Sequence, residues 1–264
     1  MVDYEKSLEH VQNFVFDLDS TVWRWNELIP GVKKTVQKLK AKGKNIFYVT
    51  DNSLLTRQGY AEKLTKLGLK TSVEDIVNSG YVAAQQLSKK GVNKALTIGE
   101  EPLVAQLREE DIEKSEEADH VVVGLDRNYT YWKMAKAAER VREGATLWAT
   151  GHGNSLQTKD KFIPGENAIM NSIKTAAEVT DYKNFGKPSD YMVEIIKEEL
   201  PVHPTNTILI GDSLESDIAI GKKMGLDTGL VLGGRSSRED IKGIEEDQAP
   251  DYVFTEFSRI LRKV

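Results

Sequence analysis

Two carboxylates stand at the end of the first apolar segment of this chain. The run Asn13-Phe14-Val15-Phe16 has the character of a buried strand, and it leads into Asp17-Leu18-Asp19-Ser20-Thr21. Residues two apart in an extended segment point to the same side, so Asp17 and Asp19 should leave the strand end together. Neighbouring carboxylates repel each other unless a divalent cation or a shared proton removes the repulsion. The pair indicates a metal site or acid–base chemistry, although a lone D-x-D is more often a solvated turn.

Three further segments carry side chains that complement this pair. Thr50-Asp51-Asn52-Ser53 offers hydroxyls and an amide for phosphate oxygens, and Gly186-Lys187-Pro188-Ser189 places a cation in a tight loop. Gly211-Asp212 follows the apolar run Ile208-Leu209-Ile210, and Asp217 comes five residues after Asp212. Each segment alone has an ordinary explanation as a helix cap or a turn. Their order and their complementary chemistry favour a single site for a phosphate and a metal ion.

Short apolar runs alternate with amphipathic ones along the chain. Val32, Val36 and Leu39 fall at positions i, i+4 and i+7, which is typical of a helix packed on a sheet. Strand and helix in alternation predict an α/β fold with a Rossmann-like parallel sheet, whose ligands bind beyond the carboxyl ends of the strands. The expected strands after the first are 44–50, 95–98, 120–123, 146–149, 207–210, 229–232 and 252–254.

The candidate chemistry lies in residues 13–53 and 186–217, and the interval between these segments has strands and helices of its own. We therefore expect two domains. Residues 1–79 and 183–264 would form the core that carries the chemistry. Residues 80–182 would form an inserted α/β module.

Together the four segments resemble the four motifs of the haloacid dehalogenase (HAD) superfamily. The matching patterns are Asp17-x-Asp19-x-Thr21, Thr50-x-Asn52-Ser53, Gly186-Lys187-Pro188 and Gly211-Asp212-x4-Asp217. The chain is also similar to the NagD-like, or 4-nitrophenylphosphatase, branch at Ile29-Pro30-Gly31, Val123-Gly124-Leu125-Asp126, and Leu230-Val231-Leu232 with Gly234. The resemblance covers residues 13–255. It implies a HAD-like core and, at 80–182, a type IIA cap that sets substrate specificity.

The activity that the resemblance implies is that of a phosphatase. It would release inorganic phosphate from small organic phosphate monoesters, 4-nitrophenyl phosphate among them, through an aspartyl-phosphate. Asp17 would be the nucleophile. Asp19 would protonate the leaving oxygen and then activate water, and it separates phosphatases from the haloacid dehalogenases, which lack this carboxylate.

The resemblance also assigns residues to the phosphate and to a metal ion. The phosphate-binding residues would be Thr50, Asp51, Asn52 and Lys187, and Lys187 would also offset the negative charge near Asp17. The expected cofactor is Mg²⁺, which prefers hard oxygen ligands. Its ligands would be the Asp17 side chain, the Asp19 carbonyl and Asp212, with Asp217 supporting the site.

Three positions depart from the pattern of the branch. Asp51 stands where Asn is usual; our interpretation is that only its backbone matters, and the alternative is contact with metal-bound water. Trp25 replaces a usual Gly, and it would narrow the entrance, stack on the substrate or pack against the insert. Gly151-His152-Gly153-Asn154 replaces the usual Asn-x-Asp in a loop that, by the resemblance, contacts the leaving group. Trp25, His152 and Asn154 are thus candidate specificity residues, although a His in a Gly-rich loop equally fits a surface position.

Composition narrows the choice of partners. The chain has 264 residues, no cysteine and a formal net charge of −5. Without cysteine there is no disulfide, thiolate metal site or cysteine nucleophile. Evenly spread Lys and Arg in an acidic chain argue against nucleic acid. Residues 1–12 have charges and no apolar run, so we expect no secretory signal. No stretch is long and apolar enough to span a bilayer, so we expect no membrane partner and a cytoplasmic location.

Alternatives remain at this stage. A phosphoacceptor or regulatory domain also uses strand-end acids, a Thr and a Lys, but receiver domains are much shorter and have no insert. A dinucleotide-binding domain would have G-x-G-x-x-G after the first strand, where this chain has acids. A phosphomutase of the same superfamily is the third alternative, although the large insert resembles phosphatase caps.

Nucleoside monophosphates, glycerol phosphate, phosphoglycolate, pyridoxal phosphate and sugar phosphates are all substrates within the branch. Relatives often form a homodimer through the cap.

Overall fold

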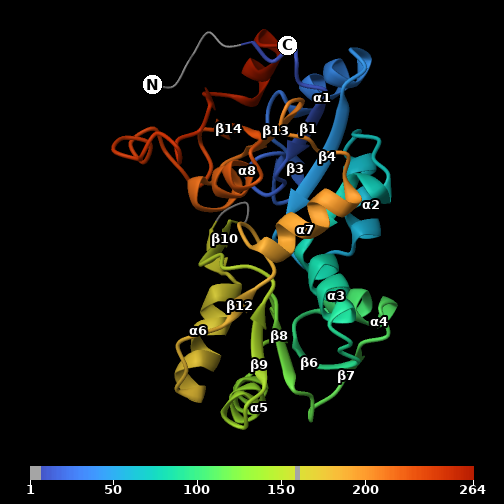
Figure 1. Ribbon diagram of the computed structural model, residues 1–264, viewed down its shortest axis with the longest axis vertical. Coiled ribbons are helices and arrows are strands. Elements are labelled where there is room, and N and C mark those ends of the chain that lie inside the picture. Colours follow the sequence, from blue (N-terminus) through green and yellow to red (C-terminus); the bar gives the residue numbers. More distant parts are fainter. Residues whose placement is uncertain (1–6, 158–160) are drawn as a thin grey trace. The chain divides into compact units, whose positions relative to one another are not determined.

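The computed structural model describes residues 7–157 and 161–264 and divides into two compact units (Figure 1). The first unit comprises Met1–Thr50, Tyr60–Val77 and Ile196–Val264, and the second comprises Asp51–Gly59 and Asn78–Ile195. Each unit has its own parallel sheet and its own helices, which confirms the α/β class. These bounds differ from the predicted 80–182 insert, and the assignment of a core and a cap stays a prediction.

The first unit is built on a six-stranded sheet in the order β15-β14-β13-β1-β4-β5. The strands from β15 to β4 pair in parallel, with Phe16 of β1 opposite Ile210 of β13 and Tyr48 of β4. Every residue of β1 and β13 is buried, as expected of strands covered on both faces. The strands are β1 (Asn13–Phe16), β4 (Asn45–Thr50), β5 (Ile76–Asn78), β13 (Thr207–Gly211), β14 (Asp227–Val231) and β15 (Tyr252–Phe254), with a hairpin of β2 (Trp23–Arg24) and β3 (Glu27–Leu28).

The helix predicted after the first strand is α1 (Val32–Ala41), and it buries Val32, Val36 and Leu39. It begins after Gly31, whose φ of 90° is a conformation that favours glycine. The other helical segments with residues in this unit are α2 (Arg57–Lys66), the 3₁₀ turn η1 (Val73–Asp75), α7 (Asp190–Glu199), the π-helical turn η2 (Leu214–Ile218), α8 (Ala219–Lys223) and the 3₁₀ turn η3 (Phe257–Arg262).

The second unit is built on a five-stranded parallel sheet in the order β12-β9-β8-β6-β7. Helices α5 and α6 pack on this sheet through a shared core that includes Val121, Leu147 and Met170 (Figure 1). The strands are β6 (Lys94–Ile98), β7 (Glu113–Lys114), β8 (His120–Val123), β9 (Thr146–Ala149) and β12 (Lys183–Asn184), with a hairpin of β10 (Ser155–Gln157) and β11 (Phe162–Pro164). The helices are α3 (Ser79–Lys89), α4 (Glu101–Glu109), α5 (Tyr131–Arg142) and α6 (Glu166–Ala177).

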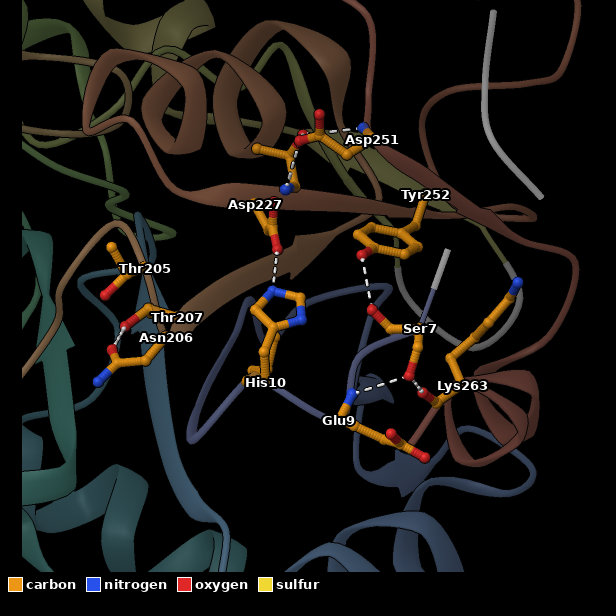
Figure 2. A network of polar contacts seen from close by, with 12 residues as sticks. Ser7, Glu9, His10, Thr205, Asn206, Thr207, Asp227, Asp251, Tyr252 and Lys263 are labelled. Atoms are coloured by element: carbon orange, nitrogen blue, oxygen red, sulfur yellow. Dashed lines mark hydrogen bonds and ion pairs between the residues drawn. The ribbon is translucent and has the colours of Figure 1, made fainter. Parts of the chain in front are cut away.

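A polar network fixes the beginning of the described chain to the first sheet (Figure 2). His10 Nε2 lies 2.9 Å from Oδ2 of Asp227, the first residue of β14, and the hydroxyl of Tyr252 donates to the carbonyl oxygen of Ser7. Ser7 Oγ donates to the Lys263 carbonyl oxygen. Asp227 and Tyr252 begin their strands, so the network lies at the amino edge of the sheet, away from the strand ends where the chemistry is predicted.

Within the described ranges, no helix combines the length and the apolar character that crossing a bilayer requires.

Candidate active site

The first unit brings three predicted residues to one edge of its sheet. β1 lies between β4 and β13: the chain adds β4 on one side of β1 and later adds β13 on the other (Figure 1). Open α/β sheets bind ligands at such a point, where the strand order reverses. Asp17 follows β1, Thr50 ends β4 and Asp212 follows β13. Because these three strands are parallel, their carboxyl ends meet at the same edge.

Three buried carboxylates gather at this edge. One ligand oxygen each from Asp17, Asp212 and Asp217 lies within 4.8 Å of the other two. Three negative charges at such separations repel each other strongly away from water, and a divalent cation offsets that repulsion. The all-oxygen donor set fits a hard cation such as Mg²⁺ or Ca²⁺. The residues present therefore fit the metal site that the motifs predict.

Asp217 also holds the loop that presents Asp212. Its Oδ2 accepts the backbone N–H groups of Asp212 at 3.0 Å and Ser213 at 3.1 Å. A Cβ atom on Gly211 would overlap the Asp217 carboxylate, so glycine is required for this close approach. Asp217 is 1% exposed, and its side chain serves the backbone as well as the acidic cluster.

The loop that follows β14 also packs against Asp212. The Arg235 N–H donates to Oδ2 of Asp212 at 2.6 Å, and a Cβ atom on Gly234 would overlap the same carboxylate. Thr21 Oγ1 lies 3.5 Å from Asp212 Oδ1, which links the first motif to the fourth. The backbone contact of Arg235 was not predicted, because a main-chain donor leaves no mark in the sequence.

Asp19 has a partner that sequence reasoning missed. The indole N–H of Trp23, a buried side chain, donates to Asp19 Oδ1 at 2.9 Å. The Lys63 ammonium lies 4.0 Å from the centroid of the Trp23 ring and donates to the Trp25 carbonyl oxygen at 2.9 Å. Burial lowers the pKa of Lys63, while the charge of Asp19 opposes that shift. The only available signal was a Trp four residues after a candidate acid.

Trp25 lies in the same segment as Trp23, but Trp23 is buried and Trp25 is exposed. Its backbone is left-handed at φ 58°, a conformation that non-glycine residues rarely adopt, and 39% of the residue is exposed. The position matches the glycine that the branch usually has there. An exposed ring on an unusual backbone is compatible with a substrate contact, which stays a prediction.

The remaining motif residues belong to the second unit. The backbone N–H of Lys187 donates to Oδ1 of Asp51 at 2.7 Å, and a Cβ atom on Gly186 would lie 3.1 Å from Cγ of Asp51. The carboxylate of Asp51 therefore has a partner in the Lys187 loop, and the role of Asp51 at the phosphate stays a prediction. Lys187 is 2% exposed, so its ammonium is held in a defined environment and is not a surface cation.

Asn52 and Ser53 help to shape the segment after Asp51. Asn52 Oδ1 accepts the Leu54 N–H at 2.9 Å, so this oxygen caps a turn. The hydroxyls of Ser53 and Thr150 are 3.3 Å apart and both buried. Because the amide oxygen of Asn52 is used in this way, its amide nitrogen would make the predicted contact with the phosphate.

The loop from Gly151 to Asn154 lies beside the Lys187 loop within the second unit. Nδ2 of Asn184 is 3.4 Å from Nδ1 of His152, and Asn184 Oδ1 accepts the Gly186 N–H at 3.0 Å. Asn184 thus connects the candidate specificity loop to the candidate catalytic one, and sequence reasoning missed it. Asn154 Oδ1 accepts a hydrogen bond from the Asn167 amide at 2.7 Å, so its side chain has a structural partner.

Comparison with known proteins identifies the class. The chain belongs to the haloacid dehalogenase-like hydrolases: the family described by that name matches residues 14–113, and a second HAD-like hydrolase family matches residues 184–260. It lies in the NagD-like branch and is a phosphatase that acts on phosphate monoesters. The predicted class, enzyme type and resemblance are confirmed.

Three relatives illustrate the match. The sugar-phosphatase AraL of Bacillus subtilis is 33% identical over 243 residues, covering 90% of this chain and 88% of AraL. The crystal structure of 4-nitrophenylphosphatase from Thermotoga maritima superimposes with a TM-score of 0.87 at 29% identity, covering 97% of this chain and 98% of that one. NagD from E. coli K-12 superimposes with a TM-score of 0.84 at 26% identity, covering 94% and 97%.

Proposed function

We propose that this chain is a Mg²⁺-dependent phosphatase that hydrolyses small organic phosphate monoesters through an aspartyl-phosphate on Asp17. The observation that carries the proposal is the buried cluster of Asp17, Asp212 and Asp217 at the switch point of the first sheet. The phosphatase names of the relatives support turnover over the stoichiometric phosphorylation of a regulatory domain.

In the proposed first step, a carboxylate oxygen of Asp17 attacks phosphorus and the bond from phosphorus to the ester oxygen breaks. Asp19 gives its proton to the leaving oxygen, and the Trp23 indole holds the Asp19 side chain by its 2.9 Å hydrogen bond. In the second step, Asp19 takes a proton from water, whose oxygen attacks the aspartyl-phosphate. Inorganic phosphate leaves and the Asp17 carboxylate is restored.

The other motif residues would bind the phosphate group and the metal ion and would neutralise negative charge. Thr50, the amide nitrogen of Asn52 and the Lys187 ammonium would bind phosphate oxygens, with Lys187 offsetting their charge. Asp17, the Asp19 carbonyl and Asp212 would hold Mg²⁺. When bound, the ion would supply positive charge to the carboxylates and to the phosphate.

The location and the oligomeric state remain proposals. We propose a cytoplasmic homodimer. Sedimentation of the purified chain tests the dimer, and a monomer at micromolar concentration contradicts it.

The test of the covalent mechanism compares two variants with 4-nitrophenyl phosphate in Mg²⁺. Asp17→Asn, which is nearly isosteric, should lose activity by several orders of magnitude. Asp19→Asn should release 4-nitrophenolate in one burst that is stoichiometric with enzyme, because this leaving group needs no proton while the second step still needs a base. A folded Asp17→Asn protein that turns over near the wild-type rate would exclude Asp17 as nucleophile. Steady turnover by Asp19→Asn without a burst would exclude Asp19 as the base.

A further inference from the structure

The ammonium of Lys63 holds the hairpin of β2 and β3 at two points. It donates to the Trp25 carbonyl oxygen at 2.9 Å, and it lies 4.0 Å from the centroid of the Trp23 ring. Lys63 belongs to α2, and both segments lie within the first unit. One side chain of α2 therefore contacts both the backbone at the end of β2 and a ring that β2 carries.

Helix α2 fixes the orientation of the Trp23 ring. Tyr60, one turn before Lys63, stacks on that ring with the two centroids 6.1 Å apart and the planes inclined by 11°. A cation over the face of an indole is attracted by the negative charge of that face, and more strongly where water is excluded. Trp23 is 1% exposed, so the contact is largely shielded from water. The ring therefore has little freedom to turn.

The orientation of the ring decides where its N–H points. The Trp23 indole N–H donates to Asp19 Oδ1 at 2.9 Å, and the Ser20 N–H donates to the Trp23 carbonyl oxygen at 2.7 Å. Burial lowers the pKa of Lys63 and the negative charge of Asp19 opposes that shift, so the ammonium and the carboxylate are close enough to attract each other. Lys63, Trp23 and Asp19 thus form one connected group.

The backbone at Trp25 gives a reason why this hairpin needs support. Its φ of 58° is left-handed, a conformation that is unfavourable for residues with a side chain. Such conformations persist where the surrounding contacts impose them. The hydrogen bond from Lys63 is one such contact, because it ends on the carbonyl oxygen of the same residue. Removing the ammonium should therefore loosen the hairpin that carries Trp23.

We propose that Lys63 is a positioning residue for Asp19. By holding the Trp25 backbone and the face of the Trp23 ring, it keeps the indole N–H directed at the Asp19 carboxylate. The inference rests on the proposed function, in which Asp19 protonates the leaving oxygen and then activates water. Proton transfer requires the donor and the acceptor to be well placed, so an unsupported Asp19 should be a poorer acid. Lys63 itself takes no part in the proton transfers.

The test compares two aryl esters of similar shape whose leaving groups differ in their need for a proton. Phenolate is a poor leaving group and benefits from protonation, whereas 4-nitrophenolate leaves without it. The quantity measured is kcat/KM in Mg²⁺, which reports the steps up to release of the leaving group. Lys63→Met keeps the length of the side chain and removes the ammonium. It should lower kcat/KM for phenyl phosphate about fivefold, as for one lost cation–π contact, and leave 4-nitrophenyl phosphate within about twofold.

Three further variants make the assignment specific. Lys63→Arg keeps a cation and a donor, and it should keep the wild-type ratio of the two esters. Lys66→Met removes an exposed lysine from the same last turn of α2 and should change neither value. Lys63→Met combined with Trp23→Phe should have the kcat/KM of Trp23→Phe alone for phenyl phosphate, because Lys63 acts through the indole N–H.

Two results would overturn the inference. An equal fall on both esters would mean that Lys63 supports the fold, and losses that multiply in the double variant would mean that it acts independently of Trp23. The proposed function is tested separately by Asp19→Asn, which should lower kcat/KM for phenyl phosphate far more than for 4-nitrophenyl phosphate. If Asp19→Asn shows that difference and Lys63→Met does not, the inference alone fails. If neither variant shows it, the acid role of Asp19 fails as well.

Discussion

Replacing Asp217 by Ala should destabilise the protein, because this side chain satisfies two buried donors. Its Oδ2 accepts the N–H groups of Asp212 and Ser213 at 3.0 and 3.1 Å, and no water would reach them at a position that is 1% exposed. A buried donor left unsatisfied costs about 1–3 kcal/mol. Two such donors give about 2–6 kcal/mol, and the removal of one charge from the acidic cluster returns part of that.

We therefore expect a net loss of about 2–4 kcal/mol in the free energy of unfolding, which corresponds to a fall in Tm on the order of 4–16 °C for a protein of this size. The assay is thermal unfolding in chelator and in Mg²⁺, with Asp217→Asn as the matched variant. Asn keeps an oxygen acceptor, so Asp217→Asn should regain most of the Tm that Asp217→Ala loses. In chelator the relief of repulsion partly offsets the lost hydrogen bonds, so the deficit of Asp217→Ala should be larger in Mg²⁺.

Two results would refute this reasoning. A Tm of Asp217→Ala within about 1 °C of the wild type would mean that the two N–H groups find other partners. An Asp217→Asn protein as unstable as Asp217→Ala would mean that the charge matters and the acceptor oxygen does not.

Two further predictions concern Asp19 and the amino edge of the first sheet. Trp23→Phe removes the indole donor to Asp19 and should lower kcat about tenfold, as expected for a lost hydrogen bond to a charged group. The control Trp132→Phe changes an exposed residue and should leave kcat unchanged. An equal kcat in the two variants would exclude a role of Trp23 in positioning Asp19. Burial alone would raise the pKa of Asp251, but hydrogen bonds from Lys222 and Thr228 outweigh it and the pKa is lowered. Stability from this group is therefore present above the unfolded pKa and lost as the pH falls through the folded one. Asp251→Asn should lower Tm at pH 7, and the difference should shrink below about pH 4; a constant difference down to pH 2 would contradict the assignment.

The regular elements of both sheets were largely predictable. β1, β8, β9 and β15 have the expected bounds, and the other expected strands are present with ends shifted by one or two residues. These strands are apolar and buried, so their patterns are strong. The hairpins β2–β3 and β10–β11, and the short β5, β7 and β12, were not predicted. Strands of two or three residues have no periodicity, and they form because their neighbours place them.

The acids of the buried cluster, Asp17, Asp212 and Asp217, were predictable for a similar reason. Asp17 and Asp212 directly follow apolar runs, and parallel strands bring their carboxyl ends to one edge whatever the details of packing. Asp217 follows Asp212 so closely that the chain itself limits their separation. The order of residues thus determined which acids meet, and the sequence also carried the motifs that place the chain among the HAD-like phosphatases.

Only the tertiary structure decided how the side chains of distant segments meet. Asp51 and Lys187 are 136 residues apart, and no pattern indicates that a carboxylate accepts that particular backbone N–H. The same holds for Glu166, whose carboxylate fills the space beside Gly151, and for the Trp23 indole on Asp19. Periodicity and motif spacing report which residues reach a strand end or a helix face. The direction of a side chain, and the partner it finds, depend on the packing of segments that are not neighbours in the chain.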